Sequence, residues 1–150
     1  MKAMDSLSVA IACDHAGFEM KEEVKKAFEG RFFELKDFGT FSLDSVDYPD
    51  MIHPMASAVN EGRYDFGIAI CGTGNGVSMV ANKYINVRAA LCWKDEIARL
   101  ARQHNDANII SLPARFVSQA EAEQMLETFF TTDFEGGRHT ARVSKISKLL

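Results

Sequence analysis

The sequence predicts an α/β fold: a single-domain three-layer sandwich in which a doubly wound sheet of five parallel strands carries helices on both faces. Short apolar runs rich in β-branched residues alternate with amphipathic segments of helical period along the whole chain, and this alternation favours a parallel sheet. At 150 residues the chain has the length of one domain, and no linker or internal repeat divides it. We therefore expect one domain over residues 1–150, with 1–6 as a short N-terminal extension.

The elements can be placed in order from the apolar runs and the turn residues. Strands are expected over residues 7–12, 32–37, 66–71, 86–93 and 109–112. Helices are expected over residues 18–28, 52–61, 77–85, 95–102, 118–130 and 138–150. Ser118 and Glu121 have the spacing of a capping box. We expect the Rossmann-like strand order 2-1-3-4-5, in which ligands bind outside the carboxyl ends of strands one and three.

The stretch CGTGNG at 71–76 stands where the third strand meets a helix. Gly72, Gly74 and Gly76 remove the side chains that would keep a ligand from the backbone, so several amides can converge on one anion. The loop is a candidate cradle for an oxyanion or a phosphate. Cys71 ends the strand and faces the same field, which suits a base or a nucleophile. A buried cysteine that acts as a small apolar residue fits the pattern equally well.

Three other polar segments are candidates for the same site. Asp14 and His15 follow the first strand, so the expected strand order brings them beside the glycine loop. Arg138 and Arg142 are four positions apart, which places both guanidinium groups on one helix face as a clamp for a phosphate or as two solvated arginines. His104, with Asn105 beside it, follows a helix and could move protons or interact with the helix dipole.

Composition excludes several classes of function. The net charge of −4 does not indicate a protein that binds nucleic acid. The charge is unevenly distributed, because residues 138–150 carry +4 and the rest of the chain −8. No apolar run is long enough to span a bilayer, and residues 1–6 do not resemble a signal peptide. The three cysteines suggest neither a disulfide framework nor a zinc site, and no spacing of histidines and carboxylates resembles a ligand set. We expect a cytoplasmic protein without metal, cofactor, nucleic-acid or membrane partner.

Taken together, these motifs resemble the B-type ribose-5-phosphate isomerases, which group with the galactose-6-phosphate isomerase subunits. The resemblance covers nearly the whole chain. It is carried by CDHAG at 13–17, DYPD at 47–50, CGTGNG at 71–76, ANK at 81–83, RQHNDAN at 102–108 and GGRHTARV at 136–143. It implies a metal-free aldose-ketose isomerase of the non-oxidative pentose phosphate pathway, which interconverts ribose 5-phosphate and ribulose 5-phosphate through an enediolate.

The resemblance also implies a role for each candidate residue. Cys71 would move the proton between C1 and C2, His104 would donate the proton that opens the sugar ring, and Thr73 would hold the developing oxyanion. Part of the family instead carries a glutamate base at the position of Val77, so loss of Cys71 should leave no substitute here. The substrate-binding residues would be Asp14, His15, Tyr48, Gly72, Gly74, Asn75, Gly76, Asn105, Arg115, Arg138 and Arg142. The family likeness further implies a homodimer or a dimer of dimers whose active sites are shared between subunits.

Other functions remain compatible with the same residues. The substrate could be a six-carbon phosphosugar such as allose 6-phosphate or galactose 6-phosphate, because the depth of a pocket is not encoded in any motif. The chain could instead be a non-catalytic phosphosugar-binding subunit in which Cys71 is structural. A thiol-redox role for Cys13 and Cys71 is a further alternative, since both are expected at neighbouring strand ends.

Overall fold

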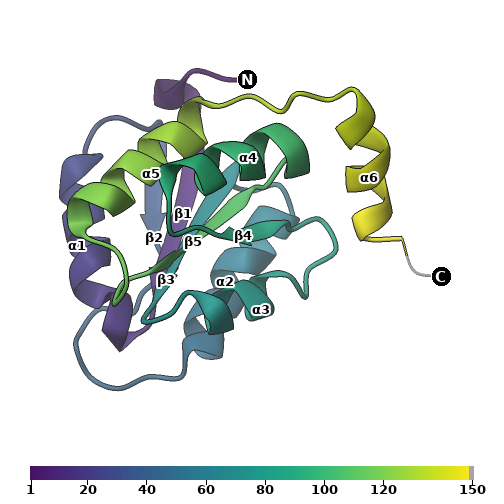
Figure 1. The fold of residues 1–150 in the computed structure, drawn as a ribbon. Coiled ribbons are helices and arrows are strands. Elements are labelled where there is room, and N and C mark those ends of the chain that lie inside the picture. Colours follow the sequence, from purple (N-terminus) through teal and green to yellow (C-terminus); the bar gives the residue numbers. More distant parts are fainter. Residues whose placement is uncertain (149–150) are drawn as a thin grey trace.

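The computed structural model describes residues 1–148 and has a five-stranded parallel sheet between two layers of helices (Figure 1). The strands are β1 Ser8–Cys13, β2 Glu34–Asp37, β3 Phe66–Cys71, β4 Ala89–Leu91 and β5 Ile109–Pro113. The helices are α1 Phe18–Ala27, α2 Tyr48–Asn60, α3 Asn75–Ala81, α4 Asp95–Asn105, α5 Gln119–Thr131 and α6 Arg138–Ile146. Two short 3-10 turns, η1 Met4–Ser6 and η2 His15–Gly17, flank β1. The predicted α/β class with helices on both faces is confirmed.

The predicted strand order is wrong in its last two strands. The observed order is β2-β1-β3-β5-β4, so β5 lies beside β3 and β4 forms the edge. All five residues of β5 are buried, as expected for a strand with a neighbour on each side, whereas the three residues of β4 are only half-buried. The predicted pairing of the first and third strands, at whose carboxyl ends a ligand is expected, is unaffected because β3 pairs with β1.

Alternation along the strands divides the core into two clusters. Ile11, Ile68 and Ile70 face the layer of α1, α4 and α5, where the aromatic rings of Phe129 and Phe130 pack. On the other face, small residues such as Ala10, Ala12 and Ala69 let α2 and α3 approach closely. Cys71 belongs to this second face, so its side chain lies on the side of the sheet that α3 covers.

Several element boundaries differ from those expected. Helix α2 begins at Tyr48 rather than at residue 52, because Pro49 occupies the first turn, where its missing N–H costs nothing. Helix α4 extends to Asn105 and ends at Asp106, which adopts a left-handed conformation with φ 46°. Ser118 and Glu121 form the predicted capping box at the start of α5. Helix α6 ends at Ile146; its predicted end at Leu150 lies outside the described residues.

The C-terminal arm, residues 132–146, leaves the body of the protein. A segment without regular structure crosses above α4 and ends in α6, which stands to one side of the sheet (Figure 1). Val143 is half-buried and Ile146 is 56% exposed, so the apolar side of α6 is largely uncovered. Within residues 1–148, none of the helices combines the length and apolar character needed to cross a membrane.

Candidate active site

Two loops meet where β1 and β3 end. The amide of Asp14 donates to the carbonyl oxygen of Ile70 at 3.2 Å, which joins the loop after β1 to the end of strand β3. Asp14 is buried, and its carboxylate accepts a hydrogen bond from the amide of Gly17. A Cβ on Gly17 would lie 2.7 Å from the oxygen of Ile70, so only glycine permits this approach. The predicted meeting of the two loops is confirmed.

The glycine loop wraps around the sulfur of Cys71. The amide of Gly74 donates to Cys71 Sγ at 3.1 Å, and Gly74 adopts φ +74°, which a residue with a side chain rarely does. A hydrogen bond of this kind is stronger when the acceptor is an anion. Cys71 is 5% exposed, whereas Thr73 and Asn75 are exposed on the outer side of the loop. The loop therefore combines a shielded sulfur with an accessible rim.

Two side chains from elsewhere lie on the glycines of this loop. A Cβ on Gly72 would meet the side chain of Arg115 at 3.2 Å, and one on Gly76 would meet the ring of Tyr48 at 2.6 Å. The amide of Arg115 also donates to the carbonyl of Gly72 at 3.0 Å. Arg115 and Tyr48 thus join Cys71 at one edge of the sheet, as expected.

His15 is oriented by the segment that leads into α2. Its Nδ1 accepts a hydrogen bond from the amide of Val46 at 3.2 Å, so this nitrogen carries no proton. The proton of the neutral ring is consequently on Nε2. His15 therefore offers one N–H donor, which suits a hydroxyl or phosphate oxygen.

An apolar wall that the sequence did not reveal borders the loop. A pocket of about 410 Å³ adjoins Thr73 and Asn75, and its wall is apolar. The wall consists of Leu91, Trp93, Pro113 and Phe116. Trp93 and Phe116 are 51% and 73% exposed, respectively. A periodicity argument could not find these residues, because they come from the ends of β4 and β5 and from the loops that follow these two strands.

The predicted site residues of α4 and α6 lie near the amino ends of the strands, at the end of the sheet opposite to Cys71. His104 and Asn105 form the last turn of α4, and β5 begins with Ile109, which pairs with Gly67 rather than with Cys71. The carbonyl of Asn105 accepts a hydrogen bond from Arg88, which precedes β4. The predicted clamp, Arg138 and Arg142, is exposed on α6 beside this edge. Within a single chain, the predicted site residues therefore lie in two groups, one at the carboxyl ends of the strands and one at their amino ends.

His104 is held in a cluster with two residues of the C-terminal arm. Its ring stacks on that of His139, with centroids 4.2 Å apart and planes at 13°. Glu135 Oε2 lies 3.5 Å from Nε2 of His139 and 3.9 Å from Nε2 of His104. The amide of Glu135 donates to the carbonyl of Gln103, which fixes the arm against α4. His139, which the sequence presents only as part of the GGRHTARV motif, is 7% exposed.

The electrostatics of this cluster favour neutral imidazole at His139. Burial, together with the nearby His104 and the positive charges of Arg138 and Arg142, holds the pKa of His139 below the ordinary histidine value. Glu135 acts in the opposite direction without cancelling this effect. The buried ring therefore keeps a lone pair near neutral pH.

The two remaining thiols, Cys13 and Cys92, are both buried. Burial raises the pKa of Cys13 and of Cys92 to about 12 in each case. Both thus stay protonated at physiological pH and do not act as nucleophiles. A redox pair formed by Cys13 and Cys71 finds no support here.

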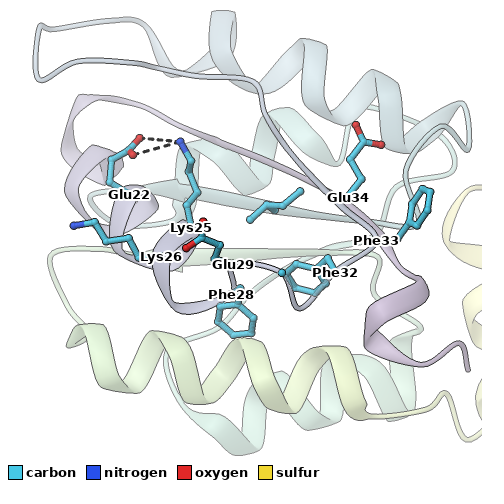
Figure 2. Close-up of a pocket in the computed structure, with 10 residues that line it drawn as sticks. Glu22, Lys25, Lys26, Phe28, Glu29, Phe32, Phe33 and Glu34 are labelled. Carbon is cyan, nitrogen blue, oxygen red and sulfur yellow. Dashed lines mark hydrogen bonds and ion pairs between the residues drawn. The ribbon is translucent and has the colours of Figure 1, made fainter.

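A further hollow lies far from Cys71. It measures about 500 Å³ and occupies the outer edge of β2 and the end of α1 (Figure 2). Phe28 and Phe32 form its floor, and the ion pair between Glu22 and Lys25 stands at its rim. Its lining contains none of the predicted site residues.

Comparison with known proteins identifies the family. The family model described as ribose/galactose isomerase matches residues 9–146. Ribose-5-phosphate isomerase B of Escherichia coli is 40% identical over 141 residues, which cover 94% of this chain and 95% of that protein. A ribose 5-phosphate isomerase from Thermotoga maritima has a similar structure, with a TM-score of 0.92 and 46% identity over 95% of this chain and 99% of that one.

A third relative has been solved with a sugar phosphate. Ribose-5-phosphate isomerase B of Mycoplasma genitalium, with bound ribulose 5-phosphate, gives a TM-score of 0.89 and 40% identity over 93% of both chains. Identity at this level over nearly full length goes beyond a shared fold. The chain belongs to the ribose/galactose isomerase family.

Proposed function

We propose that this protein interconverts ribose 5-phosphate and ribulose 5-phosphate through an enediolate, with Cys71 as the base. The observation that carries the proposal is the sulfur of Cys71, held by the amide of Gly74 inside a loop of bare backbone. Abstraction of a proton next to a carbonyl needs a base, donors for the developing oxyanion and a remote group that holds the substrate. The residues around Cys71 supply the first two of these requirements.

Proton transfer takes place between two carbons of the open-chain sugar. Cys71 Sγ removes the proton from C2 of the aldose, and the negative charge moves to O1. A proton passes from the C2 hydroxyl to O1 of the enediolate, and the thiol then returns its proton to C1, which leaves the carbonyl group at C2. Thr73 and the amides of the loop stabilise the charge on the oxygen. Asp14, His15 and Tyr48, which lie around the same strand ends, bind the sugar hydroxyls.

Substrate binding then requires the residues at the opposite edge. His104 opens the furanose ring as proton donor, Asn105 contacts the sugar, and Arg138 and Arg142 bind the phosphate together with Arg115. Because one chain holds Cys71 and His104 at opposite edges of its sheet, we propose that a second copy of this chain completes each site. The uncovered apolar side of α6 and the separated position of this helix support a homodimer or a dimer of dimers (Figure 1).

The proposal also includes the cellular compartment. Cys13, Cys71 and Cys92 are all free thiols, which is the usual state in a reducing compartment. We place the enzyme in the cytoplasm on this ground.

A coupled assay tests the function directly. Purified protein should form ribulose 5-phosphate from ribose 5-phosphate, and Cys71→Ser should lower kcat at least ~100-fold, the range typical for loss of a general base. The same variant should still bind the phosphosugar in a calorimetric titration, because the phosphate and hydroxyl contacts remain. Unchanged turnover in Cys71→Ser would refute the assignment of the base, and absence of turnover in the parent would refute the activity.

A further inference from the structure

The cluster of His104, Glu135 and His139 has the composition of a metal site, which the sequence spacing did not indicate. One oxygen of Glu135 and one nitrogen of each histidine lie within 4.8 Å of one another. The three residues come from the end of α4, from the arm and from α6, so only the fold brings them together. Two imidazoles and one carboxylate form a donor set that Zn²⁺ uses in catalytic sites, with water as fourth ligand.

Two of the three distances in the cluster are near those that a metal needs, and all three ligand atoms lie within 4.8 Å of one another. Zn–N and Zn–O bonds of about 2.0–2.2 Å place tetrahedral ligand atoms about 3.3 Å apart. The separation of 3.5 Å between Glu135 and His139 nearly meets this value, whereas that of 3.9 Å between Glu135 and His104 must shorten. His104 and Glu135 are 37% and 49% exposed in their side chains, so both can rotate toward the buried His139. Rotation must also tilt the stacked rings so that their lone pairs converge.

The charges around the cluster influence which metal ion it can hold. Arg138 and Arg142 lie on α6 together with His139 and carry positive charges close to the cluster. The same positive charges oppose a cation, and Glu135 offsets only part of them. The site therefore suits a tightly coordinating ion such as Zn²⁺ rather than Mg²⁺ or Ca²⁺, which prefer several oxygen ligands.

We propose that His104, Glu135 and His139 bind a divalent transition-metal ion of the Zn²⁺ class, and that the bound ion inhibits the isomerase. The binding stands on the geometry alone, whereas the inhibition rests on the proposed role of His104 as proton donor. A metal and a proton cannot share Nε2 of His104. When zinc occupies this atom, the ring keeps its single proton on Nδ1 and has none to give to the sugar ring oxygen.

Binding is tested with Zn²⁺ and Co²⁺ on the full chain. Cys71→Ser serves as the parent for this experiment, because it removes the one thiol that could compete for the metal. Calorimetry at free zinc set by a nitrilotriacetate buffer should give one Zn²⁺ per chain. Co²⁺ should give the visible spectrum of a nitrogen and oxygen site without a thiolate charge-transfer band. A titration without a saturable site, or a thiolate band in the Cys71 protein that is lost in Cys71→Ser, would overturn the proposal.

Single substitutions assign the ligands. Glu135→Gln and His139→Gln should each weaken zinc binding at least ~10-fold, since each removes one of three protein donors. His53→Gln is the matched control: His53 is exposed on α2 and bonds to Tyr84, so its loss should leave the affinity unchanged. Equal affinity in all three variants would place the metal elsewhere and overturn the assignment.

Inhibition is measured separately, relative to each variant's own rate without metal. Zinc should slow the wild-type isomerase, a chelator should restore it, and Glu135→Gln should raise the half-inhibiting zinc concentration at least ~10-fold. Binding without inhibition would overturn the regulatory half of the proposal and leave the site in place. Absence of isomerase activity in metal-free protein would overturn the proposed function instead, and the calorimetric result would be unaffected.

Discussion

The ring of Tyr48 occupies the space next to Gly76 so closely that a Cβ there would come within 2.6 Å of the ring carbon Cζ. Tyr48 begins α2 and Gly76 lies in the first turn of α3, so the contact joins two helices at the candidate site. Gly76→Ala must displace the ring or the loop. We expect it to lower kcat/KM about 10–100-fold, the effect typical of displacing a substrate-positioning group by about 1 Å. Steady-state kinetics with ribose 5-phosphate measure this effect.

A double-mutant cycle separates the ring from the loop. If the effect of Gly76→Ala arises through Tyr48, the same change in a Tyr48→Ala background should cost little more, so that the two effects are strongly non-additive. Additive losses would mean that the methyl group disturbs the loop itself. Circular dichroism of the three variants should be unchanged.

The fold class was predictable because parallel strands and helices leave strong local patterns. The order of β4 and β5 was missed, although a signal existed: Asn86 and Arg88 interrupt the fourth apolar run, as suits a strand at an edge. Periodicity reports which residues are apolar but not which strands pair, because pairing is decided by the burial of whole strands. The run 109–112, apolar except for Ser111, was the better candidate for the interior.

The candidate site was predictable only where it depends on local sequence. The alternating glycines of 71–76 indicate a loop whose backbone is open to a ligand. The position of Asp14 beside this loop follows from the pairing of the first and third strands, since both segments stand at the end of a strand. By contrast, the stacking of His139 on His104 joins residues 35 positions apart through the path of the arm, and no spacing encodes it. The division of the site between two edges likewise depends on which end of α4 carries His104.

Thiol labelling should distinguish Cys71 from the other cysteines. The pKa of Cys13 and Cys92 is raised to about 12 by burial, so both remain unreactive thiols at pH 8. We expect iodoacetamide to modify native protein at Cys71 alone, and intact-mass analysis should show one adduct per chain that is absent in Cys71→Ser. Saturating phosphosugar should slow the reaction. Adducts at Cys13 or Cys92 in folded protein would contradict this expectation.

Arg142 tests the phosphate clamp. Arg142→Ala removes a charge-assisted hydrogen bond that holds substrate and transition state alike, so KM should rise about 10–100-fold with a smaller change in kcat. Lys145→Ala is the matched control, because Lys145 is also basic and exposed on α6. An equal KM in Arg142→Ala and the parent, or an equal rise in both variants, would exclude a specific phosphate contact.

Substitution of a lysine in a buried ion pair between α1 and β2 should lower the stability of the fold. Lys21 is fully buried and bonds to Asp37 at 2.5 Å, while Lys25 bonds to the same oxygen at 2.8 Å. Lys21→Met leaves the carboxylate of Asp37 with Lys25 and the amide of Gly39 as partners, so the free energy of unfolding should fall by about 2 kcal/mol, the range for loss of one hydrogen bond to a charged group. Lys26→Met, which removes an exposed lysine paired with Glu23, should have little effect in the same urea titrations.

The pKa of Asp37 determines how the stability lost in Lys21→Met depends on pH. Burial raises the pKa of Asp37, but hydrogen bonds from Lys21 and Lys25 outweigh this effect and hold the pKa below the ordinary value of 3.8. The unfolded chain therefore takes up the proton first as the pH falls, so the stabilisation is complete above pH 3.8 and is lost below it. The difference between wild type and Lys21→Met should accordingly narrow below this pH. A constant difference down to pH 2.5 would show that the ionic interaction is not its cause.

Complementation between two inactive variants tests whether each active site uses two chains. Cys71→Ser and His104→Gln should each be inactive alone. In a mixed dimer, one site receives both substitutions, while the other receives Cys71 from one chain and His104 from its partner, both intact. Random pairing after co-expression should therefore restore about a quarter of the parental activity. If both residues served the same site within one chain, no mixed dimer would contain an intact site, and the mixture would remain inactive.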